Sequence, residues 1–407
     1  MSHIYPGGKK MVQTEYNNPI RQQVFLTPGM AELTLKDSFG GAMETLLQLD
    51  EIRSTRKVIL TGAGDSYAAA LAMLPAFGDL CQAIDASVMR LIEFTRFTPL
   101  ERLGLNRPEE LLVVVISAGG STSRIIEALE KAKAIGAGSL LISGKAVSPA
   151  AQAAKHVLHM KTPPLPTADT PGLCSYLASE IGLAALAATL GQVSGAITAQ
   201  ETQACCEAMH TYLSSYAGEV LDRIDEQMLA LAEDWKAFER FEFLGDSGEF
   251  GSAFFGGAKV IECSGCAVST DDTEDWCHVN YFLRDPESIG TVIMADRRAP
   301  SFSRILETVE SALFIGRPLL IVSNAEASAF TQGAAVCTLP QAPEAYPWML
   351  AMMDFIPASL LAGYLTVLRG EPFFRRFRLP AYTPIADTPF ANRACFTFSN
   401  SKIEIYQ

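Results

Sequence analysis

Two ionisable side chains in the second half of the chain have the types and the spacing that proton transfer requires. Lys259 and Glu262 are three residues apart in an apolar, helix-forming stretch, so they share one face of a helix. A carboxylate whose pKa is tuned by partial burial and by a neighbouring ammonium group can act as a general base. A satisfied ion pair at a helix end would explain the same spacing.

A turn rich in glycine and hydroxyl groups in the first half of the chain has the composition of a phosphate site. An apolar run ends at Ser117, and Gly119 allows a ligand to approach the backbone. Ser121 and Thr122 stand at the start of the helix that follows. Hydroxyl groups and free N–H groups at the N-terminus of a helix can hold an anion. An ordinary helix cap, in which Ser or Thr satisfies the helix donors, is the alternative.

The elements that position these residues occur twice along the chain. Residues 57–70 and residues 241–253 each contain a buried apolar strand, a glycine-containing turn and a helix that begins with small residues. This repetition predicts duplicated α/β domains, in which each strand-to-helix turn is a natural place for an anionic ligand. Ser66 stands in the first of these turns.

Uninterrupted Val, Ile and Leu runs alternate with helical patterns through both halves, which predicts parallel sheets covered on both faces. We therefore expect an α/β fold of two domains, each a three-layer αβα structure of the flavodoxin-like or Rossmann-like type. The predicted strands are 58–60, 84–92, 111–116, 139–143 and 156–160, then 241–245, 289–295, 318–323 and 335–339. The predicted organisation is an N-terminal arm (1–44), a first domain (45–200), a helical linker (201–236), a second domain (237–375) and a C-terminal tail (376–407).

Composition restricts the classes of partner. The chain has 407 residues, of which 49% are hydrophobic, and this is enough for two or three domains with large cores. A formal charge of −13 argues against nucleic acid or an anionic membrane as a partner. The nine cysteines lack the rhythm of a disulfide scaffold, and the apolar runs 181–190 and 358–368 are too short to span a membrane. We expect a cytoplasmic protein without a signal peptide.

Two further motifs suggest cofactors, and each has a simpler explanation. The turn 62–64 could begin a dinucleotide fingerprint, but the third glycine and the acidic residue after the second strand are missing. Cys263 and Cys266, with Cys277 and His278 farther along, could suggest zinc, but the spacing is poor for four ligands and Cys263 and Cys266 lie in an apolar stretch. Buried structural cysteines explain that pattern, and we expect no cofactor and no metal.

Taken together, these residues resemble the sugar isomerase (SIS) fold in tandem, specifically the isomerase half of glucosamine-6-phosphate synthase. The resemblance extends from about residue 45 to the end of the chain. In the first half, the matching elements are Ser66-Tyr67 (family Cys-Gly-Thr-Ser-Tyr), Glu93-Phe94 (Ser-Glu-Phe), 117–122 (Ser-Gln-Ser-Gly-Glu-Thr) and 167–170 (Val-Ala-Ser-Thr). In the second half, they are Lys259 and Glu262 (Leu-Lys-Leu-Lys-Glu), His278 (Glu-Leu-Lys-His) and Lys402, which matches the family's C-terminal lysine.

The resemblance implies a role for each matching residue. Glu262 would move a proton between C1 and C2 of an open-chain sugar phosphate, and Lys259 would steady the developing enediol charge. His278 would assist ring opening and, as in the family, would be supplied across the interface of a homodimer. Lys402 would form a Schiff base or gate the carbonyl. The substrate and its phosphate would be bound by Ser66, Ser117, Gly119, Ser121, Thr122, Asp169 and Thr170.

Several positions depart from the family pattern. Ala118 and Gly119 replace Gln and Ser in the phosphate cradle, and Ser121 replaces an acidic residue. Asp169 replaces a serine at the sugar, where a carboxylate would repel a phosphate but could bind a hydroxyl or an amine. Arg124 could add positive charge to the cradle, or it could belong to a solvated helix face.

The segment before residue 45 is too short for the glutaminase domain of the synthase and has no cysteine near its start. We therefore expect a protein without its own ammonia source, similar to stand-alone aminosugar-phosphate deaminase/isomerases and fructosamine-6-phosphate deglycases. The predicted activity is isomerisation, deamination or deglycation of an aminosugar or fructosamine phosphate through C1–C2 proton transfer. The alternative is a non-catalytic SIS protein that binds a sugar phosphate and has a regulatory role.

Overall fold

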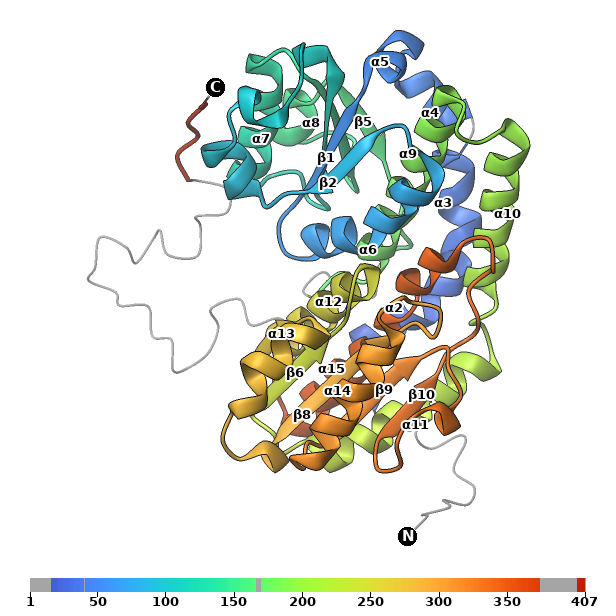
Figure 1. The fold of residues 1–407 in the computed structure, drawn as a ribbon, viewed down its shortest axis with the longest axis vertical. Helices are drawn as coiled ribbons and strands as arrows, with labels where there is room; N and C mark the ends of the chain where they lie inside the picture. Colours follow the sequence, from blue (N-terminus) through green and yellow to red (C-terminus); the bar gives the residue numbers. More distant parts are fainter. Residues whose placement is uncertain (1–15, 40, 166–169, 374–400, 407) are drawn as a thin grey trace.

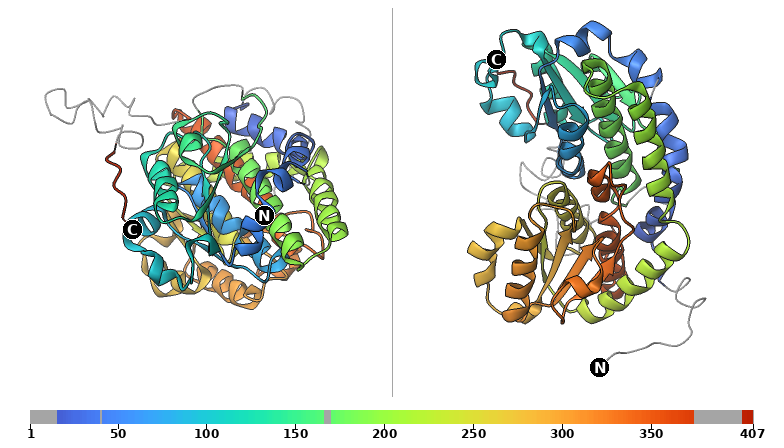
Figure 2. Two further views of the ribbon diagram at one scale, coloured as in Figure 1. Left: turned by 90° about the horizontal axis from the view of Figure 1, so that it is seen from above. Right: turned by 45° about the vertical axis from the view of Figure 1, so that its right-hand side comes forward.

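The computed structural model describes residues 16–39, 41–165, 170–373 and 401–406. Two five-stranded sheets, in which all strand pairs are parallel, lie one above the other, and helices cover both faces of each sheet (Figures 1 and 2). The predicted class, two αβα units in tandem, is confirmed.

In the first unit the sheet has the strand order β2-β1-β3-β4-β5. Its buried strand residues alternate between two cores, with Val58 and Leu60 facing one and Ile59 facing the other. Helices α6 and α9 cover the first face, and α7 and α8 cover the second. The strands are β1 Lys57–Thr61, β2 Asp85–Val88, β3 Leu111–Ile116, β4 Gly138–Ser143 and β5 His156–His159; the helices are α6 Asp65–Leu80, α7 Ser123–Ala134, α8 Pro149–Ala153 and α9 Cys174–Ser194.

The second unit repeats this plan with the strand order β10-β9-β8-β6-β7. Helices α12 and α15 cover one face and α13 and α14 the other, while α10 and α11 connect the two units along one side (Figure 2). The strands are β6 Arg240–Leu244, β7 Ala267–Asp271, β8 Ile289–Ala295, β9 Leu319–Ser323 and β10 Ala335–Thr338; the helices are α10 Ala199–Ser214, α11 Glu219–Trp235, α12 Gly248–Ser264, α13 Thr273–His278, α14 Phe302–Phe314 and α15 Phe355–Arg369.

The turns after β1 and β6 have the same backbone conformation. Gly64 precedes α6 with φ 56° and ψ −123°, and Ser247 precedes α12 with φ 55° and ψ −122°. Each turn also requires a glycine two residues earlier, because a Cβ on Gly62 would lie 2.7 Å from the Cβ of Ser66 and one on Gly245 would lie 2.5 Å from a backbone oxygen. The structural repeat that the sequence predicts is therefore present down to the backbone angles.

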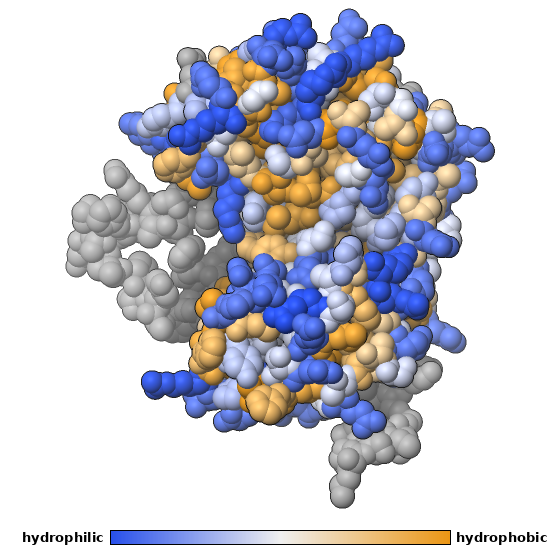
Figure 3. Space-filling view, viewed as in Figure 1, coloured by the Kyte–Doolittle hydropathy of each residue, from blue (hydrophilic) through white to orange (hydrophobic). Residues whose placement is uncertain are grey.

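The two units pack together through α6 and α12, which approach very closely. A Cβ on Gly251 of α12 would lie 2.4 Å from the backbone nitrogen of Ala72 and 2.7 Å from the carbonyl oxygen of Ala68, both on α6. Small residues at the crossing therefore let the two backbones touch, and this contact joins the units into one continuous core. On the face shown in Figure 3, polar and apolar side chains are mixed over both units, and apolar side chains also reach the surface at the waist between the units.

Some local predictions differ from the structure. The region 1–44 was expected to be an arm without a regular pattern, yet α2 Pro19–Leu26 and α3 Met30–Ser38 are helices with buried Ile20, Val24 and Met30, followed by the short helices α4 Gly41–Leu46 and α5 Leu49–Ser54. The predicted strand 84–92 ends at Val88, and residues Glu93–Phe97 form a π-helical turn. Strand β7 was missed because its residues are mostly small or polar and it lies at the edge of the sheet.

By length and composition alone, two segments could cross a membrane, Cys174–Ser194 and Pro347–Arg369. In both, 94% of the most apolar stretch is buried inside the protein, as in the core helices of soluble proteins. The apolar runs 181–190 and 358–368, which were expected to be too short to span a membrane, lie within these longer segments.

Candidate active site

Lys259 lies at the junction of the two units, between two carboxylates that come from different helices. Its side chain is fully buried, and its Nζ atom lies 2.5 Å from Oε2 of Glu262 and 2.7 Å from Oδ2 of Asp65. It also lies 4.7 Å from the centre of the Phe255 ring. Asp65 is the first residue of α6, whereas Lys259 and Glu262 are on α12. A buried ammonium group requires such partners, so this triad holds the two units in register.

The surroundings of Glu262 raise the pKa of its carboxyl group. Burial raises the pKa of Glu262, the Lys259 ammonium lowers it, and the Asp65 carboxylate raises it again, so the pKa lies above its ordinary value. Burial lowers the pKa of Lys259, but the two carboxylates outweigh this effect, and the side chain stays charged. The Glu262 side chain is 32% exposed, so a ligand can reach it.

Asp65 is a site residue that sequence reasoning missed. Its Oδ1 atom is buried and has no hydrogen-bond partner among the residues that the structure describes. The signal in the sequence was an acidic residue directly after Gly64. Acidic residues are common in the first turn of any helix, because their negative charge interacts favourably with the helix dipole. Only the packing of α6 against α12 shows that this acid contacts Lys259.

The predicted phosphate cradle lies at the carboxyl end of β3. Ser117 is buried, and its Oγ accepts a hydrogen bond of 3.1 Å from the N–H of Gly120. Gly120 has φ 65°, and a Cβ there would lie 2.2 Å from Oγ of Ser148, so the turn needs glycine. Gly119 has open space around it, since nothing lies within 4 Å of the position of a Cβ. The turn therefore presents backbone to a ligand.

The start of α7 is not capped by a side chain. Thr122 occupies the cap position, but its hydroxyl accepts no bond from the first turn of the helix, and Ser121 is exposed. The alternative of an ordinary Ser/Thr cap therefore does not hold in this structure. N–H groups that a cap would satisfy remain available, as an anion site requires. Ser66 is half-buried in the first turn of α6, in the equivalent position after β1.

At the predicted sugar-binding segment, Thr170 is occupied by protein contacts. Its Oγ1 accepts a hydrogen bond of 2.9 Å from the side-chain amide of Gln23 on α2 and donates one of 3.1 Å to the carbonyl of Pro171. Helix α2 thus contacts Thr170 directly. Asp169, the other predicted residue here, lies outside the described residues.

His278 is not part of the Lys259 cluster in this chain. It is the last residue of α13, its side chain is 65% exposed, and its Nε2 lies 2.9 Å from Oε1 of Glu274. In the part of the chain that the structure describes, it forms no hydrogen bond or ion pair with Lys259 or Glu262.

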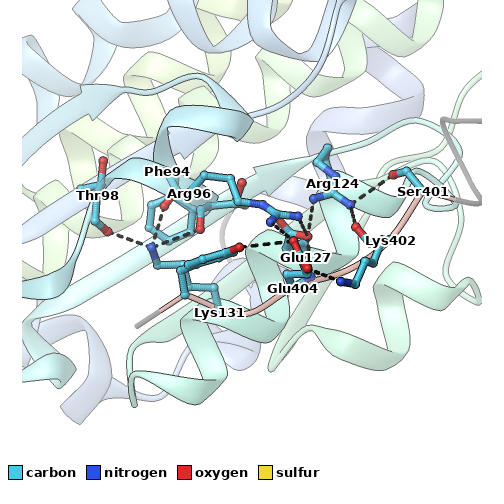
Figure 4. Close-up of polar contacts among 11 residues, drawn as sticks. Phe94, Arg96, Thr98, Arg124, Glu127, Lys131, Ser401, Lys402 and Glu404 are labelled. Atoms are coloured by element: carbon cyan, nitrogen blue, oxygen red, sulfur yellow. Dashed lines mark hydrogen bonds and ion pairs between the residues drawn. The ribbon is translucent and has the colours of Figure 1, made fainter.

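Lys402 also lies away from Lys259 and Glu262. Its ammonium group is 81% exposed and pairs with Glu404, and the segment around it lies against α7 of the first unit (Figure 4). Arg124 contacts this segment and Glu127, so its interpretation as a solvated helix face is wrong. Of the four predicted catalytic residues, the single chain brings together Lys259 and Glu262 and leaves His278 and Lys402 elsewhere.

The sequence of this chain is similar to a known protein family and to a known enzyme. Residues 51–187 match the SIS domain family. The chain is 24% identical over 369 residues to glutamine–fructose-6-phosphate aminotransferase [isomerizing] 1 of Arabidopsis thaliana, and this match covers 88% of the chain but only 52%, about half, of that protein.

Solved structures share the fold of most of the chain. The C-terminal domain of glucosamine-fructose-6-phosphate aminotransferase from Francisella tularensis has a TM-score of 0.76 at 16% identity, covering 88% of this chain and 98% of that one. Glucosamine-6-phosphate deaminase from Thermotoga maritima has a TM-score of 0.60 at 17% identity, covering 86% and 94%. The predicted resemblance to tandem SIS proteins and to the isomerase half of the synthase is confirmed.

Proposed function

We propose that this chain transfers a proton between C1 and C2 of a sugar phosphate, as an aldose–ketose isomerase or as a deaminase or deglycase of an aminosugar or fructosamine phosphate. The observation that carries the proposal is the placement of Lys259 between Asp65 and Glu262 at the junction of two SIS-type units. The names of the similar proteins, an isomerising aminotransferase and a glucosamine-6-phosphate deaminase, support this class of chemistry.

In the proposed mechanism, Glu262 removes the proton from the carbon next to the carbonyl of the open-chain sugar. The C–H electron pair forms the carbon–carbon double bond of an enediol, and the carbonyl oxygen takes up a proton from solvent water. The proton held by the partly exposed Glu262 exchanges with solvent. Glu262 then gives a proton to the carbon that first carried the carbonyl, while the hydroxyl group on the other carbon loses its proton to solvent and becomes the new carbonyl, which completes isomerisation. The nearby Lys259 ammonium offsets the negative charge that develops during the transfer.

The phosphate of the substrate would be held at the carboxyl ends of β1 and β3. Hydroxyl groups come from Ser66, Ser117, Ser121 and Thr122, and backbone N–H groups from the uncapped start of α7 and from Gly119. Ligands of open parallel sheets bind in the crevice at this end of the strands. The substitutions of the family pattern leave fewer side-chain donors, so backbone donors carry more of the binding.

A homodimer would complete the site with His278 from the partner. The chain directly after His278 exposes large apolar side chains: Val279 is 63% exposed, Phe282 74% and Leu283 41%. An apolar cluster of this kind beside a catalytic candidate is typical of an interface.

A cytoplasmic location, with neither membrane nor nucleic acid as partner, belongs to the same proposal.

The proposed function is tested by assaying a panel of hexose, aminosugar and fructosamine 6-phosphates for isomerised or deaminated product. Calorimetry on the same panel measures binding independently of turnover. We expect turnover of at least one of these compounds, and the compound that turns over fastest assigns the substrate class. Tight binding of a sugar phosphate without turnover of any compound would instead establish the non-catalytic, regulatory alternative.

The neighbours of Glu262 should shift the pH dependence of activity in opposite directions. The acidic limb of kcat/KM follows deprotonation of a general base in the free enzyme. Asp65→Asn removes a charge that raises the pKa of Glu262, so the limb should move to lower pH. Lys259→Met removes a charge that lowers this pKa, so the limb should move to higher pH. We expect shifts on the order of one pH unit; movement in the same direction in both variants would contradict the proposed base.

A further inference from the structure

The C-terminal segment, residues 401–406, lies against α7 of the first unit, where its contacts centre on one buried carboxylate (Figure 4). Glu127 has a fully buried side chain and accepts hydrogen bonds from Nε and Nη2 of Arg96, at 2.7 and 2.9 Å. It also accepts one from Arg124, one turn before it on α7. The backbone N–H of Glu404 donates to the same carboxylate at 2.9 Å. The segment thus binds directly to the group that orders both arginines.

The arginines in turn hold the segment by its side chains and its backbone. Nη1 of Arg96 lies 2.5 Å from Oε2 of Glu404, and its guanidinium group lies 4.9 Å from the centre of the Tyr406 ring. Arg124 donates to Oγ of Ser401 at 3.1 Å and to the carbonyl of Lys402. Both Lys402 and Arg96 lower the pKa of Glu404, to about 2, so its carboxylate is charged at neutral pH.

The residues that bind the C-terminal segment are themselves held in place by contacts within the first unit. Arg96 lies on the π-helical turn Glu93–Phe97, and π-helical turns are frequent at functional sites. The buried ammonium group of Lys131 donates to the carbonyls of Phe94 and Thr98, both at 2.8 Å, and so clamps this turn onto α7. The guanidinium group of Arg96 is therefore oriented by contacts that do not involve the C-terminal segment.

We propose that Arg96, Glu127 and Arg124 form a tail-docking site, that Glu404 anchors the C-terminal segment to it, and that docking positions Lys402 beside the phosphate cradle. Arg124, which holds the Lys402 carbonyl, stands in the first turn of the helix that begins directly after Thr122. The part of the proposal that concerns Lys402 rests on the proposed function, because Lys402 can affect catalysis from this position only if a sugar phosphate binds in the cradle. While docked, Lys402 is paired with Glu404 and acts as a cation rather than as a free amine.

Docking itself is tested on the full chain by hydrogen exchange with mass spectrometry, without reference to activity. Glu404→Ala removes the anchor, and Glu130→Gln, which changes an acid elsewhere on α7, is the matched control. We expect the amides of residues 401–406 to exchange at least tenfold faster in Glu404→Ala and at the wild-type rate in the control. Equal exchange of this segment in the wild-type protein and in Glu404→Ala would overturn the docking site.

The effect on Lys402 is tested by a double-mutant cycle on kcat. We expect Glu404→Ala and Lys402→Ala each to lower kcat about tenfold, and the double variant to lose no more than either alone. Glu404→Asp, which keeps the charge, should recover most of the activity. Losses that multiply in the double variant would overturn the positioning role of Glu404. If the wild-type protein turns over no sugar phosphate, the proposed function fails, and the exchange experiment still decides docking.

Discussion

Replacing Glu262 with glutamine is expected to lower kcat for C1–C2 proton transfer by two to four orders of magnitude, the usual contribution of a positioned general base. Glutamine has nearly the same shape and can still accept a hydrogen bond from Lys259, but it cannot take up the substrate proton. Substrate binding should therefore change little, and the loss should appear in kcat rather than in KM.

The control for this variant is Glu326→Gln, which changes an exposed glutamate in the second unit whose side chain forms no hydrogen bond or ion pair with the residues that the structure describes. It should keep the wild-type kcat, while calorimetry on Glu262→Gln shows that the sugar phosphate still binds. A Glu262→Gln protein that retains half of the wild-type kcat would exclude Glu262 as the base.

Mixing two inactive variants should restore activity if His278 serves the site of a partner subunit. Glu262→Gln and His278→Gln each lack one essential group, and each alone should have below about 1% of the wild-type rate. After dissociation and reassociation of an equal mixture, half of the dimers are mixed, and each mixed dimer has one intact site out of two. The mixture should therefore recover about a quarter of the wild-type rate, by the symmetry of a two-fold dimer.

The matched test of the interface is Phe282→Glu, which places a charge in the exposed apolar cluster after His278. It should shift the protein to a monomer in sedimentation or light scattering and remove activity without affecting Glu262. A mixture of the two inactive variants that gains no activity, in a protein shown to exchange subunits, would contradict the shared site.

Most of the scaffold could be predicted from the sequence because its signals are local. Strand Leu111–Ile116, for example, is a continuous apolar run, as is typical of a strand buried on both faces. The strand-to-helix turns were recognisable because Gly62 and Gly245 stand where any side chain would collide with the helix. The pairing of Lys259 with Glu262 followed from helical spacing alone.

The features that sequence reasoning missed depend on contacts between distant segments. Asp65 becomes a partner of Lys259 only because Gly251 lets α12 touch α6. Arg124 looked like either a cradle residue or a solvated residue, whereas its partners are the nearby Glu127 and residues Ser401 and Lys402 at the other end of the chain. The N-terminal helices α2 and α3 have weak patterns of their own and are stabilised by packing on α15 and α9.

Solvent-deuterium exchange tests the central claim, proton transfer by Glu262, most directly. The substrate identified in the panel is incubated with the protein in D2O, and the C1 and C2 protons are followed by NMR. The account predicts that the wild-type protein exchanges one of these protons for deuterium and that Glu262→Gln abolishes the exchange while still binding the substrate. Undiminished exchange in Glu262→Gln, or turnover by the wild-type protein with neither carbon labelled, would contradict it.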